Sequence, residues 1–286
     1  MSNGIGARQN EKNSIAMLAA QRQLYNDVKM YDWSSIILSV WIPLGLATIL
    51  IFTHDNVQWT FVSYVLSIAS MFFSMLIDGY INKKKELAAF IQQKFDTYVY
   101  IMPWDGRIFG KEKNVNLKIA KYSKKILDDD VQKTKLMDWY TPIVDKFSLE
   151  DGILACQREN FSWDVGLRKR FRVASIIVIA VLCVAILVIG VWKNETVVQL
   201  ICRFAFMVPM IQWLLGTVKQ INGDIKTLDE LDENINSSEV KTMKDLQDIQ
   251  KVIFDHRKRC FTIPNYFYKA FKDNDEDREH RIATLN

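Results

Sequence analysis

Apolar residues gather in four long stretches, and polar residues dominate the rest of the chain. Each stretch approaches the roughly 20 residues that an α-helix needs to cross about 30 Å of hydrocarbon. Helices in the cores of soluble proteins usually run only about 10–14 residues. The pattern therefore predicts four membrane spans, at Ser34–Phe52, Trp59–Ile77, Val173–Trp192 and Val197–Val218.

Two short polar turns, Thr53–Gln58 and Lys193–Thr196, join these spans into two helical hairpins. Lysine and arginine favour the cytoplasmic side of a span. The two turns contain only Lys193, whereas the other ends of the spans are flanked by Arg22, Lys29, Lys83–Lys85, Arg168–Arg170, Arg172, Lys219 and Lys226. Both termini and the long central segment are therefore expected in the cytoplasm. The first 33 residues contain no apolar run of the kind found in a cleaved signal peptide.

These features predict an all-α membrane protein with four transmembrane helices in two hairpins and a mainly helical cytoplasmic region. The chain divides into an N-terminal cytoplasmic segment (1–33), a first hairpin (34–81), a central cytoplasmic segment (82–170), a second hairpin (171–218) and C-terminal cytoplasmic helices with a tail (219–286).

The second span is expected to continue into the cytoplasm as one long helix. An apolar stripe with helical spacing follows it, formed by Leu87, Phe90, Ile91, Phe95 and Tyr98. Pro103 and Gly106 predict the end of this helix, and a further helical pattern spans about Val115 to Leu127.

Capping and heptad signals predict the remaining helices. Ser148 with Asp151 resembles a capping box that starts a helix leading into the third span. Beyond the fourth span, apolar residues from Val218 to Ile235 follow near-heptad spacing, which suits packing on the central segment or on a neighbouring subunit. Another helix is expected at about Glu239–Asp255, and residues 273–286 are expected to be disordered.

Charge and chemistry-bearing residues restrict the function classes. The net charge of +4 is modest, and the mean hydropathy of -0.02 is that of an ordinary soluble chain. The basic clusters Lys83–Lys85 and Arg168–Arg172 are interpreted as topological signals beside anionic head groups, not as a site for a nucleic-acid polymer. Asp78 and His256 lie near the membrane interface, but they form no recognisable catalytic constellation. We therefore expect no enzyme.

No metal site, disulfide or cofactor is expected either. The four cysteines lack a CxxC spacing, and the three histidines are scattered along the chain. The stretch GRIFGK at Gly106–Lys111 is one residue too short for a phosphate-binding loop. Glu112 stands where such a loop has Ser or Thr, so this stretch is predicted to be a turn.

Three stretches carry a family resemblance. FDTYVYIMPWDGRIFGK (Phe95–Lys111), DWYTPIVDKFSLEDGILACQRENFSWDVGLRKRF (Asp138–Phe171) and IFDHRKRCFTIPNYFYKAF (Ile253–Phe271) resemble the SMODS-associating four-transmembrane effectors. The resemblance extends from about Met30 to Phe271. It implies a bacterial inner-membrane effector of anti-phage defence. In such a system a partner nucleotidyltransferase makes a cyclic oligonucleotide, the effector binds it, and the membrane is permeabilised in an abortive infection.

A passive membrane scaffold, or an anchor for a cytoplasmic partner, is the alternative function. Hairpins with cytoplasmic helices suit it equally well. Ion flux or dye entry upon addition of a cyclic nucleotide separates the two hypotheses.

A cyclic oligonucleotide presents phosphates to Arg or Lys and bases to aromatic planes. The candidate ligand-binding groups are Trp104 with Arg107 and Lys111, Trp139 with Tyr140, and Arg158 with Trp163. Packing is the alternative role at each position, because tryptophans commonly fill cores.

Pore residues are expected in the second and fourth spans. Four spans with few polar residues enclose little water in one copy, so a conducting form is expected to be a homo-oligomer. Serines recur at spacings of three or four in the second span, at Ser63, Ser67, Ser70 and Ser74. Small residues of this kind either allow close helix packing or face water.

Arg203 is a full charge inside the fourth span. Gln199 lies four residues earlier on the same helical face, and Pro209 removes a backbone hydrogen bond one turn further on. The sequence predicts that Arg203 and Gln199 line the conduction path. Snorkelling of Arg203 toward the interface is the alternative.

Overall fold

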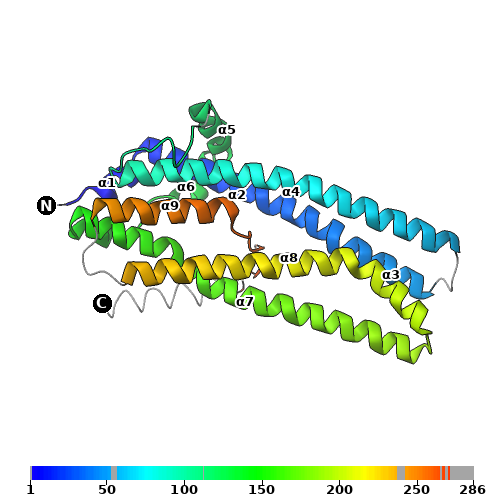
Figure 1. Ribbon diagram of the computed structural model, residues 1–286. Helices are drawn as coiled ribbons and strands as arrows, with labels where there is room; N and C mark the ends of the chain where they lie inside the picture. Colours follow the sequence, from blue (N-terminus) through cyan, green and yellow to red (C-terminus); the bar gives the residue numbers. More distant parts are fainter. Residues whose placement is uncertain are drawn as a thin grey trace.

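The computed structural model describes residues 2–52, 57–111, 113–236, 242–264, 266, 267 and 270. Within these ranges all regular structure is helical, and two antiparallel pairs of long helices lie side by side (Figure 1). The elements are α1 (Ile5–Gln9), α2 (Lys12–Ile36), a π-helical segment (Ile37–Trp41), α3 (Ile42–Phe52), α4 (Val57–Val99), α5 (Val115–Leu127), α6 (Asp130–Thr134), a 3-10 helix (Pro142–Lys146), α7 (Leu149–Trp192), α8 (Val197–Asn236) and α9 (Met243–Arg259).

The first pair consists of α2 and α3 against α4. The first predicted span is not a uniform α-helix, because it begins inside α2 and widens into the π-helical segment before continuing as α3. Pro43 supplies the physical reason. It has no N–H for the α-helical bond to the carbonyl of Ser39, and the N–H of Ile42 instead reaches the carbonyl of Ile37.

α4 and α7 are far longer than a bilayer is thick. With 43 and 44 residues they extend about 65 Å each, so each continues beyond its apolar stretch, as the sequence predicts. α4 ends at Val99, ahead of Pro103. α7 begins after Ser148, whose Oγ accepts a hydrogen bond from the N–H of Asp151 at 3.1 Å, which confirms the predicted cap.

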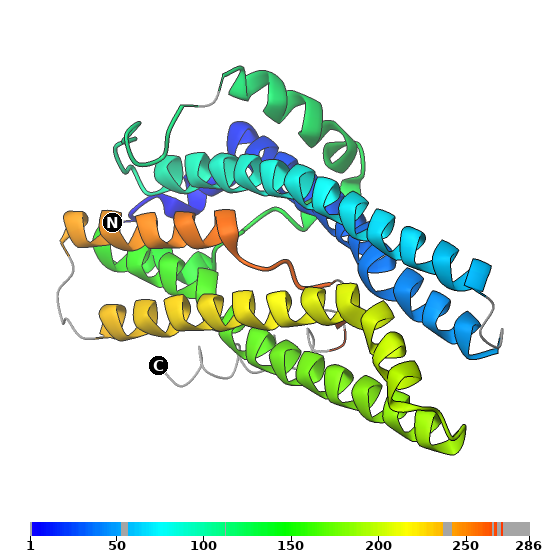
Figure 2. The same cartoon turned by 45° about the vertical axis from the view of Figure 1, so that its right-hand side comes forward.

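Two helices in the described part of the chain, α4 and α7, are long and apolar enough to cross a membrane. Only 22% of the most apolar window of α4 and 11% of that of α7 is buried, unlike a core helix of a soluble protein. The second pair is α7 with α8, which begins at Val197 after the predicted turn. α8 bends in its apolar half, the part that contains Pro209 (Figure 2).

A helical bundle occupies the end of the molecule opposite the turn between α7 and α8, the end that the sequence predicts to be cytoplasmic (Figure 1). Its main core brings α2, α4, α5 and the start of α7 together around Leu18, Leu24, Ile91, Phe95, Ile126 and Ile153. The near-heptad residues Leu228 and Ile235 of α8 pack against Ile249 and Ile253 of α9, so this stripe packs within the chain.

α9 begins at Met243 and ends at Arg259, later at both ends than the predicted Glu239–Asp255. The start is set by a capping box, in which Thr242 and Asp245 bond each other's backbone amides. Residues 273–286, predicted to be disordered, lie outside the described residues.

Candidate functional site

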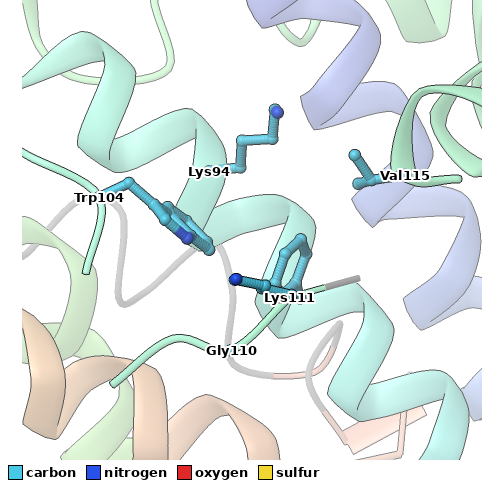
Figure 3. Close-up of a pocket in the computed structure, with 6 residues that line it drawn as sticks. Lys94, Trp104, Gly110, Lys111 and Val115 are labelled. Atoms are coloured by element: carbon cyan, nitrogen blue, oxygen red, sulfur yellow. The ribbon is translucent and has the colours of Figure 1, made fainter. Parts of the chain in front are cut away.

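A cavity of about 240 Å³ opens beside the C-terminal half of α4, where the chain returns from α4 toward α5 (Figure 3). It is lined by Phe90, Lys94, Trp104, Gly110, Lys111 and Val115. Two of these residues come from α4, three from the connecting loop and one from the start of α5.

The loop shape follows from its sequence. The N–H of Met102 reaches back to the carbonyl of Thr97 at 2.9 Å, and Pro103 then directs the chain away from the helix axis. This places Trp104 edge-on against Phe90, with ring centroids 5.1 Å apart. Gly110 has φ 79°, a left-handed conformation that favours glycine, and the stretch Gly106–Lys111 forms turns as predicted.

The cavity combines positive charge with aromatic surface. Neither Lys94 nor Lys111 takes part in the ion pairs formed among the described residues. Two ammonium groups with no ion-pair partner in the described part of the chain suit an anion such as a phosphate, and the Trp104 ring, 38% exposed, offers a stacking surface. Because pockets for whole drug-sized ligands span roughly 300–1,000 Å³, this cavity suits one nucleotide unit of a larger ligand.

The structure brings two of the predicted ligand residues together, namely Trp104 and Lys111. Arg107, predicted with them, is exposed and does not line the cavity. Phe90, Lys94 and Val115 were missed by sequence reasoning. Phe90 was assigned to an apolar stripe, and no motif distinguishes Lys94 from other lysines on a helix.

The other two predicted pairings lie elsewhere. Tyr140 is buried, and its hydroxyl donates to Oδ1 of Asp96 at 2.6 Å, so it has a core position. Trp139 is half-buried, with the Arg22 guanidinium 5.9 Å from its ring centroid. Arg158 donates to Oδ1 of Asn236 at 3.0 Å on the surface. The side chain of Trp163 lies outside the described residues.

Comparison with known proteins agrees with the resemblance carried by the loop and the start of α7. The sequence model of a family described as SMODS-associating 4TM effector domain matches residues 3–284. The chain belongs to this family. A protein of Bacillus cereus (strain VD146), described as a probable CBASS effector molecule, is 24% identical over 293 residues, covering 96% of this chain and 95% of that protein. No solved structure matches. The family description and the two apolar helices indicate association with a membrane.

The serine stripe of this effector family member is a packing seam in the structure. The four serines predicted from the sequence, Ser63, Ser67, Ser70 and Ser74, are all buried. The Ser74 hydroxyl lies 2.8 Å from those of Ser35 and Ser39, which connects α4 to α2 and to the π-helical segment. In a single copy these serines thus allow close packing between helices, which is one of the two roles that the sequence suggests for them.

The predicted polar residues of the fourth span lie near the start of α8. The side chains of Thr196 and Gln199 bond each other's backbone amides, with Oε1 of Gln199 2.9 Å from the N–H of Thr196, so Gln199 caps the helix. The side chain of Arg203 lies outside the described residues.

A chain of aromatic contacts joins the cavity to α9. Trp104 lies 5.2 Å from Phe109, and Phe109 lies 5.4 Å from Phe254 of α9, in edge-to-face geometry. Phe109 and Phe254 are both buried. Trp104 is therefore linked to α9 through Phe109, and a movement of Trp104 would be passed to α9 by this contact.

Sequence reasoning also missed a buried polar network between α4, α7 and α9. Asp96 accepts hydrogen bonds from Arg257 at 2.5 Å and from Gln250 at 3.0 Å. Gln250 also donates to Gln93, and Gln157 of α7 donates to Gln250 at 3.0 Å. Burial and the Asp96 charge raise the pKa of Tyr140 well above its usual value, so this residue stays neutral.

Two members of the basic clusters, Lys85 and Arg168, bond protein groups. Both are only 4% exposed, so their charges are held by protein groups instead of lipid head groups. Arg168 bonds Asp164 at 2.7 Å and Asp224 at 2.5 Å. Burial opposes ionisation of Asp164, but Arg168 and His256 hold its pKa below the usual range.

The two residues considered for catalysis belong to different clusters. Asp78 accepts a hydrogen bond from Ser35 at 3.0 Å, whereas His256 lies 3.4 Å from Asp164. In the part of the chain that the structure describes, no group of three or more His, Cys, Asp or Glu side chains is placed to hold a metal ion.

Proposed function

We propose that the chain is a bacterial inner-membrane effector that binds a cyclic oligonucleotide and then permeabilises the membrane in anti-phage defence. The family and the relative's description as a probable CBASS effector molecule support this proposal. The observation that carries it is the position of the cavity. Phe90 and Lys94 belong to the same continuous helix, α4, whose other half is apolar enough to cross the membrane.

The proposed topology has four spans. The helices α2–α3, α4, α7 and α8 each cross once, and the end of α3 at Phe52 and that of α7 at Trp192 face away from the cytoplasm. Both termini are then cytoplasmic, together with the cavity and α9. The effector itself performs no catalysis in this proposal, and a partner nucleotidyltransferase supplies the ligand.

The proposed ligand contacts follow from the cavity lining. A phosphate of the cyclic oligonucleotide lies near Lys94 and Lys111, and a base stacks on Trp104. The rest of the ring remains outside this small cavity. Because the cavity holds one nucleotide unit, the other units of the ring would be recognised by groups around the cavity.

The conducting form is proposed to be a homo-oligomer. The most apolar parts of α4 and α7 are largely exposed in one copy, and the serines of α4 are used for packing within the chain. One copy therefore offers apolar outer faces suited to lipid or to further copies. A water-filled path requires several copies around it.

Reconstitution tests this function. The purified protein is placed in phosphatidylethanolamine–phosphatidylglycerol liposomes that contain a self-quenching dye, and cyclic di-AMP, cyclic GMP–AMP and cyclic tri-AMP are added in turn. We expect at least one of them to bind and to release dye, with cross-linked oligomers appearing in the same samples. Binding without release would instead support a non-conducting scaffold, and absence of both would contradict the proposal.

A further inference from the structure

The last residue of α9 and the four residues after it, Arg259–Ile263, contact both helical hairpins and are called the clasp below. Three successive backbone carbonyls in it each accept a hydrogen bond from a different long helix. The donors are Gln220 of α8 to Arg259 at 2.6 Å, Lys85 of α4 to Cys260, and Arg168 of α7 to Phe261 at 3.0 Å.

Further contacts fix the same segment. The N–H of Phe261 donates to Oδ2 of Asp224 at 2.8 Å, and the same oxygen accepts from Arg168. The Phe261 ring stacks on Phe171 with centroids 5.6 Å apart. Ile263 is buried in the cluster that α7 and α8 form here. Polar and apolar contacts thus hold the clasp against the second hairpin.

The clasp lies where the predicted spans meet the cytoplasm. Lys85 follows the second span, Arg168 precedes the third, and Gln220 follows the fourth. In Figure 2 the chain leaves the orange end of α9 and runs between the pair that contains α4 and the pair formed by α7 and α8. Separation or rotation of the two hairpins at this level therefore breaks at least one of these bonds.

The bond of Lys85 has an unusual setting for a juxtamembrane lysine. Burial of an ammonium group is costly unless hydrogen bonds compensate it. Lys85 is only 4% exposed, and it reaches a backbone carbonyl of the clasp instead of solvent or head groups. The first hairpin is thereby tied to a segment that the second hairpin also holds.

We propose that the clasp is an autoinhibitory lock, which holds the two hairpins in the closed arrangement until the ligand displaces α9. This inference rests on the proposed function and adds a regulatory device to it. The route from the cavity is short, because Trp104 contacts Phe109, Phe109 contacts Phe254 of α9, and the clasp directly continues α9. Movement of Trp104 on nucleotide binding shifts α9 and loosens the clasp.

Removal of clasp donors provides the first arm of the test. Gln220→Leu removes an exposed donor from α8, and Lys85→Met removes the donor from α4 without leaving a buried charge. Each variant is expected to release dye from the liposomes described above at least several-fold faster than the parent without nucleotide. Lys219→Met, at the neighbouring exposed position, is the matched control and is expected to behave as the parent.

A reversible cross-link provides the second arm. Lys85→Cys is combined with the native Cys260, while Cys156, Cys183 and Cys202 are replaced by alanine. A bis-maleimide reagent with a cleavable disulfide in its linker then bridges the two thiols across the gap that the lysine side chain filled. The cross-linked protein is expected to bind nucleotide but to release no dye, and reduction of the linker is expected to restore release. Thiol titration before and after reaction verifies the cross-link.

The two arms separate the clasp from the proposed function. Leakage by Gln220→Leu in a protein that responds to none of the three nucleotides would support the lock and contradict the ligand part of the function. Nucleotide-triggered release by the parent and equally by the cross-linked protein, with no leakage from Gln220→Leu, would overturn the lock and leave the function standing.

Discussion

Arg257 of α9 donates a hydrogen bond from Nη1 to Oδ2 of Asp96 in α4 at 2.5 Å, across 161 positions of sequence. Both residues are buried, and the other carboxylate oxygen of Asp96 accepts from Tyr140 at 2.6 Å. α9 is therefore fastened to the C-terminal half of α4 by an ion pair that water does not screen.

Loss of this ion pair is expected to destabilise the helical bundle that α9 forms with α4 and α7. Arg257→Met leaves the Asp96 carboxylate buried with fewer donors, and breaking a buried pair in this way typically costs about 3–5 kcal/mol. The control is Lys169→Met, which breaks a surface pair with Asp229 and is expected to cost about 0–1 kcal/mol. Denaturant unfolding of the detergent-solubilised protein measures both, and equal losses would contradict the assignment.

The cavity predicts a specific pattern of affinity changes. Lys94→Met and Lys111→Met each remove one ammonium group from the lining, and each is expected to weaken nucleotide binding about tenfold, equivalent to about 1.4 kcal/mol. Trp104→Leu removes a stacking surface worth about 1–3 kcal/mol. Calorimetric titration of the detergent-solubilised protein measures these effects.

Two arginines predicted from the sequence serve as discriminating controls for the cavity. Arg107 is exposed outside the lining, and Arg158 bonds Asn236 on another surface. Arg107→Ala and Arg158→Ala are therefore expected to bind as the parent does. If either abolished binding while Lys94→Met did not, the ligand site would lie outside the cavity.

Local signals predicted much of the fold. The Val115–Leu127 helix and the Ser148 cap were both confirmed, because helical spacing and capping chemistry depend only on neighbouring residues. The π-helical segment was not predicted, although Pro43 is its local cause. A proline in an apolar run is compatible with several helix distortions, and the sequence does not select one.

Long-range polar contacts could not be predicted in the same way. Gln93, Asp96 and Gln157 occupy positions that, by residue type, are usually exposed. They are buried because α9 returns beside α4 and supplies Gln250 and Arg257 as partners. Four of the six residues that line the candidate cavity were missed as site residues; Lys94, for example, has no signature until the loop from Trp104 to Lys111 folds beside it.

Asp32 is expected to make stability depend on pH. Burial raises its pKa to about 7, Lys85 and Lys29 oppose the shift, and Asp78 adds to it. Its Oδ2 is buried and has no hydrogen-bond partner among the described residues. The folded protein therefore holds a proton at Asp32 that the unfolded chain, with the usual value of 3.8, has lost.

The sign follows from this order of pKa values. Between about pH 4 and pH 7, Asp32 is ionised in the unfolded chain but still protonated in the folded protein. Ionisation therefore stabilises the unfolded state alone, and the free energy of unfolding falls as pH rises. Above about pH 7 Asp32 is ionised in both states, so this loss of stability stays constant. Asp32→Asn removes the ionisation. Its stability relative to the parent is expected to rise across that window and then to level off, as measured by unfolding at a series of pH values. A difference that does not vary with pH would contradict this expectation.

Arg203 is the charged residue within the fourth predicted span that best tests the proposed conduction path. α8 begins at Val197, so the Cα of Arg203 lies about 9 Å further along the helix, inside the predicted hydrocarbon boundary. A guanidinium that faces a water-filled path attracts anions, whereas one that snorkels to the interface leaves the path unchanged. Gln199 is neutral and caps the helix start, so Arg203 is the charged residue of the predicted pair.

We predict that Arg203 lines the path of the open oligomer. Arg203→Glu is then expected to shift ion selectivity toward cations, and Arg203→Leu to lower conductance, with nucleotide affinity and expression unchanged in both. Lys193→Glu changes the charge in the turn before α8 and controls for a general effect of surface charge near the membrane. Reversal potentials in planar bilayers measure selectivity. If both Arg203 variants conduct as the parent does, the guanidinium snorkels, and its role in the fourth span is structural.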